Sequence, residues 1–377
     1  MQRTLRAAAA AAVAAACLAA QAGTFVYVSN AEDGTISGYQ IDGAAGCLLP
    51  LATTTAGALV MPLALSPNGR YLYAAVRSQP YSAVSYRIDA RTGALDRLAT
   101  ASLPESMAYL SIDRTGRCLF GASFGGDVVS VSAIGPQGVA QGQALQVIRT
   151  GRHAHSIVPD ATNRFVYVGN LGVHRVLQFA FDERSGALTP IGEGFVPAVD
   201  GSGPRHSAPS PDVRYLYVLG ELFGTVTIYT FDRATGALTR GASADGVPER
   251  YRLEKGLIRP PLGQGEKVDH TPRIWAADIK ITPDGRHLYT TERTSSTVTA
   301  YQVDPASGRL TRQATIEVEK QRRGIAIDPR GRWLVVAGEK SAEVGLYAID
   351  PATGALRRTA GAPAGKCANW VEIVDTE

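Results

Sequence analysis

The decapeptide YRIDARTGAL at residues 86–95 decides the fold, because close copies of it recur along the chain. The copies are FAFDERSGAL at 179–188, YTFDRATGAL at 229–238 and YAIDPATGAL at 347–356. Each begins with alternating large apolar residues, as a half-buried strand does, and ends in a turn of the form Asp-x-x-Thr/Ser-Gly. In weaker form the turn glycine recurs seven times, at residues 46, 93, 138, 186, 236, 308 and 354.

A second motif, an apolar strand usually led by arginine, alternates with the first. It is clearest in RYLY 70–73, RFVY 164–167, RYLY 214–217 and RHLY 286–289, and it also occurs seven times. Successive copies lie 46 to 50 residues apart, except for one gap of 72. Repeats of this length, with short strands and glycine turns, are typical of propeller blades of four strands each. We therefore predict an all-β, seven-bladed β-propeller with an insertion at about residues 244–273.

The two ends of the repeat array are complementary. The first strand, TFVY 24–27, corresponds to the second strand of a blade, whereas NWVEIV 369–374 corresponds to an innermost strand that has no blade of its own. We expect the C-terminal strand to complete the first blade. Residues 23–377 would then form a single closed domain without an exposed strand edge.

Composition and charge narrow the class of protein. Of the 377 residues 45% are hydrophobic, and the net charge of +4 is spread along the chain. This excludes a disordered chain and argues against a nucleic-acid partner. Three cysteines follow residue 22, so one disulfide at most is possible. The oligomeric state is not indicated.

The N-terminus has the pattern of an export signal. Arg3 and Arg6 precede an apolar run at residues 7–20, and AQA 20–22 provides a cleavage site. We expect residues 1–22 to be a signal peptide and the mature chain to be periplasmic or secreted. The alternative is an alanine-rich extension that stays attached to a cytoplasmic protein. The run is too short to serve as a transmembrane anchor.

Two positions of each blade should meet on one face of the central channel. One is the start of the innermost strand, six residues before a turn proline. In the blades that have this proline the position holds Met61, His153, Arg205, Ala277 and Arg323. The other is the end of the second strand, which includes Asn170, Glu221, Arg293 and Glu339. We expect one pocket for an anionic substrate, lined by His153, Arg205, Glu221, Arg293, Arg323 and Glu339.

The other histidines and motifs give weaker evidence for a functional site. His155, His174 and His206 have a simpler interpretation as turn or strand-flanking residues. The sequence has no phosphate-binding loop, dinucleotide fingerprint, zinc spacing or calcium loop, and we expect no cofactor and no resident metal.

Several stretches carry a resemblance to a known family. They are GPRH 203–206, YVLGEL 217–222, WAADIKITPDGRHLY 275–289, ERTSSTV 292–298 and RG 323–324. Over residues 24–377 the chain resembles the seven-bladed propeller lactonases, which include 6-phosphogluconolactonase and 3-carboxy-cis,cis-muconate cyclase. The resemblance implies an enzyme that hydrolyses a small lactone.

The resemblance also implies site residues. The family's pocket has one histidine, two arginines and a glutamate, and the matching motifs assign catalytic roles to His153, Arg205, Arg293 and Glu221. We expect substrate to be bound in addition by Arg323, Asn170, Glu339 and Trp275. Glu292 stands where the family often has Asn or Asp, and its longer carboxylate could alter the size or charge of the pocket.

As a mechanistic hypothesis, Arg205 and Arg293 hold an anionic group and polarise the lactone carbonyl. Glu221 would activate water and His153 would protonate the departing ring oxygen. Glu221→Gln should then lower turnover about 100-fold with little change in melting temperature.

Three alternatives remain open from the sequence. The same groups could close a lactone instead of opening it, or the face could bind a partner without catalysis. Glu221 and Asn170 could also hold calcium in a metal-dependent sugar lactonase. Because phosphorylated sugars are cytosolic, the predicted export leaves the phosphorylation of the substrate open.

Overall fold

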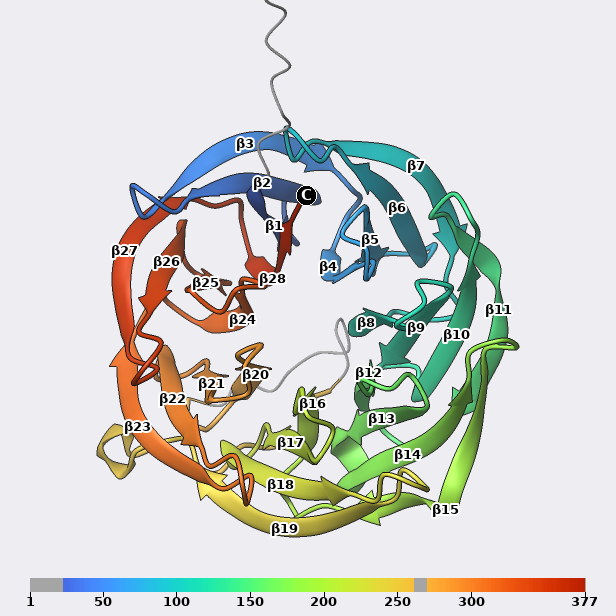
Figure 1. Cartoon of the computed structure of the whole chain (residues 1–377), viewed down its shortest axis with the longest axis vertical. Coiled ribbons are helices and arrows are strands. Elements are labelled where there is room, and N and C mark those ends of the chain that lie inside the picture. The colour runs from blue at the N-terminus through green and yellow to red at the C-terminus, as the bar shows by residue number, and fades with distance from the viewer. Residues whose placement is uncertain (1–22, 261–269, 377) are drawn as a thin grey trace, which may run out of the picture.

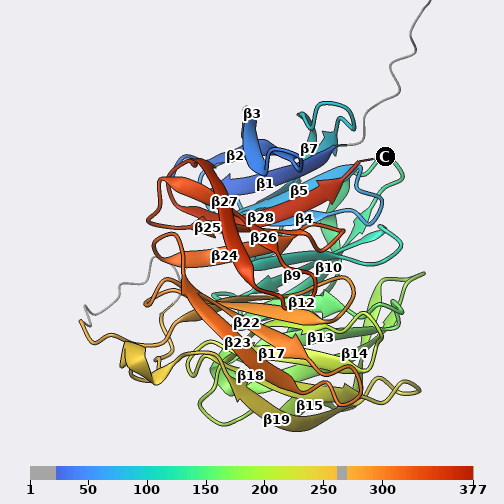
Figure 2. The ribbon, with the colours of Figure 1, turned by 60° about the vertical axis from the view of Figure 1, so that its left-hand side comes forward.

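A computed structural model describes residues 23–260 and 270–376 of the chain. The predicted signal peptide lies outside the described residues. Seven four-stranded antiparallel sheets stand around a common axis as the blades of a ring (Figure 1). The turned view shows strands of successive blades stacked across the molecule (Figure 2). The predicted seven-bladed propeller is confirmed.

The strands fall into four concentric sets. The innermost strands are β28 (Ala368–Asp375), β4 (Val60–Leu65), β8 (Tyr109–Ile112), β12 (Ala154–Pro159), β16 (Pro204–Pro209), β20 (Ala276–Ile281) and β24 (Arg322–Ile327). The second strands are β1 (Thr24–Asn30), β5 (Tyr71–Val76), β9 (Cys118–Ser123), β13 (Phe165–Asn170), β17 (Tyr215–Gly220), β21 (His287–Glu292) and β25 (Trp333–Gly338). The third strands are β2 (Thr35–Asp42), β6 (Ser82–Ile88), β10 (Val128–Ile134), β14 (Arg175–Asp182), β18 (Thr225–Phe231), β22 (Thr297–Val303) and β26 (Glu343–Ile349). The outer strands are β3 (Cys47–Thr55), β7 (Leu95–Ser102), β11 (Ala140–Arg149), β15 (Ala187–Pro197), β19 (Leu238–Asp245), β23 (Leu310–Glu317) and β27 (Leu356–Pro363).

The two sequence motifs meet between neighbouring blades. The tyrosine hydroxyl that ends one motif donates to the carbonyl of the turn glycine in the next blade. The pairs, with their O···O distances, are Tyr27–Gly93 (2.8 Å), Tyr167–Gly236 (2.7 Å), Tyr217–Gly308 (3.1 Å) and Tyr289–Gly354 (2.8 Å). We call these contacts the tyrosine clasps. They explain why the two motifs recur in register.

The turn requires glycine for two reasons. At Gly236 the backbone has φ +75°, which L side chains rarely adopt. A Cβ there would also lie 2.2 Å from the ring of Phe165 in the preceding blade. The turn glycine therefore sets both the chain direction and the distance between blades.

The ring closes through its two ends, as predicted. β28 pairs antiparallel with β1, from Thr24 opposite Asp375 to Asn30 opposite Ala368. Trp370 of β28 also reaches the centre of the ring, where its ring centroid lies 5.2 Å from that of Tyr109 and 5.6 Å from that of His206. These three side chains come from blades one, three and five, so the C-terminal strand fills part of the channel.

The predicted insertion lies between β19 and β20 and begins later than expected, because β19 extends to Asp245. It contains the 3-10 helix η2 (Glu249–Tyr251) and an isolated bridge between Glu254 and Arg273. The Gly256 N–H donates to the Leu222 carbonyl (2.7 Å), which attaches the insertion to the face where the innermost strands begin. A second 3-10 helix, η1 (Leu171–Val173), follows β13.

Two smaller points concern the described part of the chain. No helix in it has both the length and the apolar surface that crossing a membrane requires. Cys47, Cys118 and Cys367 are free thiols in the structure.

Deleting residues 367–377 should unfold the whole domain, because blade one loses its innermost strand and β1 gains an open edge. Far-UV circular dichroism during heating would measure this. A truncated chain that keeps the cooperative transition and melting temperature of the full chain would contradict it.

Candidate active site

The site is created by a recurrent irregularity at the start of the innermost strands. In six blades the register with the second strand shifts there, which leaves one or two residues without a partner. The unpaired residues are Asn369, Met61 and Pro62, His155, Arg205 and His206, Ala277 and Asp278, and Arg323. A β-bulge of this kind redirects side chains, and here several of them meet across blades in the centre of the ring.

The ends of the second strands reach the same face. The first residue after such a strand donates its N–H to the carbonyl just before the innermost strand of the same blade. This bond joins Glu221 to Gly203 (2.8 Å), Arg293 to Trp275 (3.1 Å) and Glu339 to Gln321 (3.0 Å). These backbone hydrogen bonds explain why the two positions converge on one face, as predicted.

Glu221 joins two arginines at the centre of the candidate site. Its Oε2 lies 2.6 Å from Nε of Arg205, and its Oε1 lies 3.0 Å from Nη2 of Arg293. Arg205 is only 1% exposed. The three residues come from adjacent blades, five and six, and were all predicted from the sequence.

Charge and burial act against each other in this group. Burial raises the pKa of Glu221, but Arg293, Arg205, Arg259 and Arg323 outweigh it and hold the pKa below its usual value. Burial lowers the pKa of Arg205 to about 9, although Glu221 opposes the shift. At neutral pH the carboxylate and the guanidinium are therefore both ionised.

A buried histidine and aspartate fix the remaining side of Arg205. The sequence analysis set His206 aside, yet its Nε2 lies 3.0 Å from Nη1 of Arg205 and its Nδ1 lies 2.9 Å from Asp278 Oδ1. Burial and the charge of Arg205 lower the pKa of His206 to about 3, although Asp278 opposes this shift. Burial alone would raise the pKa of Asp278, but Lys280 and His206 outweigh it and lower the pKa to about 2. His206 is thus neutral, with Nδ1–H donating to ionised Asp278 and Nε2 accepting from Arg205. Nη1 of Arg205 also donates to the Ala277 carbonyl.

The two histidines at the start of blade four have different surroundings. His153 precedes the bulge, stacks on Phe124 with ring centroids 4.1 Å apart, and its Nδ1 lies 2.9 Å from the Phe124 carbonyl. His155 occupies the bulge, and its ring centroid lies 5.3 Å from that of His206. Burial, followed by the positive charge of Arg205, lowers the pKa of His155 well below its ordinary value. Within the described chain no hydrogen bond or ion pair joins His153 to Arg205, Glu221 or Arg293.

The remaining predicted residues differ in their placement. Arg323 and Glu339 form an ion pair of 2.9 Å at the end of blade seven. Asn170 is fully buried and its Nδ2 donates to the Thr150 carbonyl (2.6 Å), so this amide nitrogen supports the loop before β12. Its Oδ1 is enclosed without a partner. Trp275 is half-buried beside Arg293, whose Nε donates to the Trp275 carbonyl (3.0 Å).

Glu292 does not alter the pocket in the way considered from the sequence. Its carboxylate accepts the backbone N–H groups of Trp275 (2.8 Å), Thr294 (3.1 Å) and Ser295 (2.6 Å), and the Ser295 hydroxyl (2.6 Å). Four donors thus hold it in the turn after β21. Its longer side chain organises the loop that carries Arg293.

Two further arginines reach this face. Arg259, from the insertion, lies over the Trp275 ring at 3.7 Å and is among the charges that lower the pKa of Glu221. Arg77 follows β5 and reaches the bulge of blade two, where Nη1 lies 3.2 Å from Met61 Sδ. Arg77 occupies the second-strand end of blade two, a position that the sequence analysis did not single out. No repeat pattern could have indicated Arg259.

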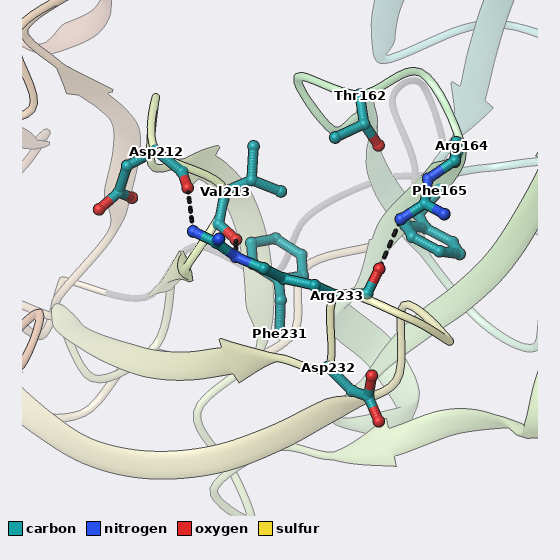
Figure 3. A pocket seen from close by; sticks show the side chains of 8 residues that line it. All are labelled: Thr162, Arg164, Phe165, Asp212, Val213, Phe231, Asp232 and Arg233. Atoms are coloured by element: carbon teal, nitrogen blue, oxygen red, sulfur yellow. Dashed lines mark hydrogen bonds between the residues drawn. The ribbon is translucent and has the colours of Figure 1, made fainter.

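A separate pocket of about 220 Å³ lies between blades four and five (Figure 3). It is lined by the turns that end β12 and β16, and therefore opens on the opposite face of the ring. Arg233 crosses it, with Nη2 2.8 Å from the Asp212 carbonyl. Arg164 and Arg233 donate to backbone carbonyls of its lining, and it holds none of the predicted site residues.

The donor set does not favour a metal. Within the described ranges no group of three or more His, Cys, Asp or Glu side chains is placed to hold a metal ion. Both oxygens of Glu221 face arginines, so this carboxylate is engaged by guanidinium groups and not available to a cation, which argues against the calcium site considered as an alternative.

Comparison with known proteins agrees with this architecture. Residues 25–373 match the family described as "Lactonase, 7-bladed beta-propeller". The 6-phosphogluconolactonases of Pectobacterium carotovorum subsp. carotovorum and Serratia proteamaculans are each 36% identical to this chain, over 79% of its length and 83% of theirs. A solved periplasmic gluconolactonase of Pseudomonas aeruginosa is similar in fold, with a TM-score of 0.80, 24% identity, and coverage of 95% of this chain and all of that one. The chain therefore belongs to the seven-bladed β-propeller lactonase family and is a 6-phosphogluconolactonase-like member of it.

Proposed function

We propose that the chain hydrolyses an anionic sugar lactone on the face where the bulges converge. The observation that carries this proposal is the excess of buried guanidinium groups around Glu221. Such a group binds carboxylate or phosphoryl oxygens through paired hydrogen bonds. The relatives named 6-phosphogluconolactonase support a lactone of the aldonic-acid type.

Arg205 and Arg293 would stabilise the oxyanion that forms when water adds to the lactone carbonyl. Arg205 is held by Glu221, by His206 and by the Ala277 carbonyl, so its guanidinium does not need to reorganise during the reaction. Donors that are fixed before the reaction stabilise a developing negative charge most effectively. Nη2 is the nitrogen of Arg205 that these acceptors do not use.

Glu221 is better suited to hold these arginines than to activate water. Both of its oxygens face guanidinium nitrogens, and its pKa is lowered. A carboxylate with both oxygens engaged by guanidinium groups is poorly placed to take a proton from water. We therefore replace the role expected from the sequence with a positioning role.

His155 is our candidate for the proton transfers. It is neutral at neutral pH, because burial and then Arg205, with a contribution from Arg323, lower its pKa. A bound anion would offset these charges and raise its basicity at the moment when it is needed. His155 would take a proton from water as the water oxygen bonds to the carbonyl carbon. The bond from that carbon to the ring oxygen then breaks, and the ring oxygen receives the proton.

Glu221→Gln should lower kcat/KM by at least about 100-fold, because the arginines lose their orientation. It should also lower the free energy of unfolding by about 3 kcal/mol, since Arg205 would be left buried without its counter-ion. Steady-state kinetics and chemical denaturation would measure the two effects. Wild-type activity in this variant would contradict the assignment, and unchanged stability would contradict the ion-pair argument.

Substituting each histidine in turn tests whether the protons are transferred by His153, as expected from the sequence, or by His155, as proposed here. His155→Gln should lower kcat by about 100-fold. His153→Gln serves as the matched control and should lower kcat by less than about fivefold, a range that proton-transfer groups normally exceed. A larger loss of kcat in His153→Gln than in His155→Gln would instead assign the proton transfers to His153.

The pH profile gives a second test. In the free enzyme the neutral form of His155 is active and burial lowers its pKa well below the ordinary value, so kcat/KM should show no acidic limb near pH 6.5. Initial rates on unphosphorylated gluconolactone, corrected for spontaneous hydrolysis, would measure this. An acidic limb centred near pH 6.5 would show an unperturbed histidine instead.

A further inference from the structure

The carboxylate of Asp278, in the bulge of β20, accepts hydrogen bonds from three successive blades. Its Oδ1 accepts Nδ1–H of His206 from blade five (2.9 Å) and the N–H of Ile279 from its own strand (2.9 Å). Its Oδ2 accepts the N–H of Ile325 from blade seven (3.1 Å). Asp278 is buried and Ile325 fully so. Buried N–H groups need an acceptor, and this one side chain serves three of them.

The bond to blade five leads to Arg205. Nε2 of His206 accepts from Nη1 of Arg205 (3.0 Å), which requires the ring hydrogen to be on Nδ1. Asp278 keeps the hydrogen there, because an ionised carboxylate can only accept. The plane of the histidine ring is held by Tyr109 and Trp370, whose ring centroids lie 4.9 Å and 5.6 Å away. Asp278 therefore determines which face of Arg205 has an acceptor.

The bond to blade seven supports the backbone beside Arg323. Arg323 is the residue left unpaired where β24 shifts its register against β25, and Ile325 follows it by two residues. An innermost strand has a neighbouring strand on one side only, so N–H groups on its other side need other acceptors. The Oδ2 of Asp278 is the acceptor for Ile325. It thus fixes the chain just after the bulge that carries Arg323.

We propose that Asp278 is a positioning residue for both Arg205 and Arg323, and that lactone turnover depends on its two carboxylate oxygens. This rests on the proposed lactone hydrolysis and adds to it a residue that acts through its neighbours. Lys280, with Nζ 4.0 Å from Oδ1, favours the ionised carboxylate that this role requires. One side chain on blade six would then align arginines on the blades before and after it.

Asparagine is the informative substitution, because it has nearly the same shape but only one acceptor oxygen. With that oxygen at the Oδ1 position, the NH2 group faces the N–H of Ile325. In the reverse orientation the NH2 group faces Nδ1 of His206, whose hydrogen must move to Nε2 and there meets the donating Nη1 of Arg205. Either orientation brings two donors together, so one of the two arginines loses its support.

A double-mutant cycle in the full chain tests this. Asp278→Asn should lower kcat on gluconolactone at least about 30-fold and change KM less than about threefold, because the aligned arginines act in the transition state. His206→Gln should lower kcat about tenfold. Because both residues act on Arg205 through one chain of hydrogen bonds, the double variant should lose no more than Asp278→Asn alone. A protein in which Asp278 only supports the fold would show losses that multiply.

Asp284→Asn is the matched control, since it makes the same substitution in an exposed turn of blade six and should change kcat less than twofold. Circular dichroism would verify that each variant folds. A double variant more than about threefold slower than Asp278→Asn, or an Asp278→Asn variant within threefold of the wild-type kcat, would overturn the proposal.

Nitrogen NMR of the wild-type chain gives a readout that does not depend on catalysis or on the folding of a variant. With labelled histidine, and with the His206→Gln spectrum to identify the signals, His206 should carry its hydrogen on Nδ1. A hydrogen on Nε2 would overturn the proposal. A wild-type chain that hydrolyses no lactone but keeps this hydrogen on Nδ1 would reject the proposed function and retain Asp278 as the residue that positions Arg205.

Discussion

The contact between each blade and the next determines the rest of the structure. One four-stranded sheet cannot bury both of its faces, so it depends on the blade that follows. The tyrosine clasps join blades one to two, four to five, five to six and six to seven. The candidate site draws on three of these joined blades: Arg205 and Glu221 stand on blade five, Arg293 on six and Arg323 on seven. The distances between their charged groups therefore follow from how blades are spaced.

The site combines like charges at a cost to stability. Arginines repel each other and lose hydration on burial, and the ion pairs with Glu221 and Glu339 offset part of this cost. Glu221 reduces the cost by serving two arginines at once, while neutral His206 accepts a hydrogen bond from Arg205 without adding a charge. In the free protein the positive charge of these arginines is therefore only partly neutralised, and an anionic substrate neutralises more of it. Such a site gives up some stability in favour of function.

The sequence predicted the ring, its closure and the Arg205–Glu221–Arg293 group, because a repeat aligns equivalent positions in every blade. It failed where side-chain placement departs from that alignment. Counting back from a turn proline selected His153, but Pro159 ends β12 and lies two residues before the position of the turn proline in the other blades, so the equivalent innermost position is His155. Glu292 was expected near the substrate, yet backbone N–H groups of its own turn bind the carboxylate. Arg259 belongs to the insertion, to which no repeat applies, and the partners of His206 become visible only when β16 and β20 lie side by side.

The bulges have a consequence for how such a chain could diversify. Because their residues take no part in the strand ladder, a substitution there changes the chemistry of the centre without breaking a backbone pairing. Met61 and Ala277 occupy the positions that hold Arg205 and Arg323 in other blades. An arginine, histidine or carboxylate at either one would enter the same space from a new direction. Ancestral duplication of one blade would thus have supplied several equivalent positions around a single site, and selection could alter them one at a time.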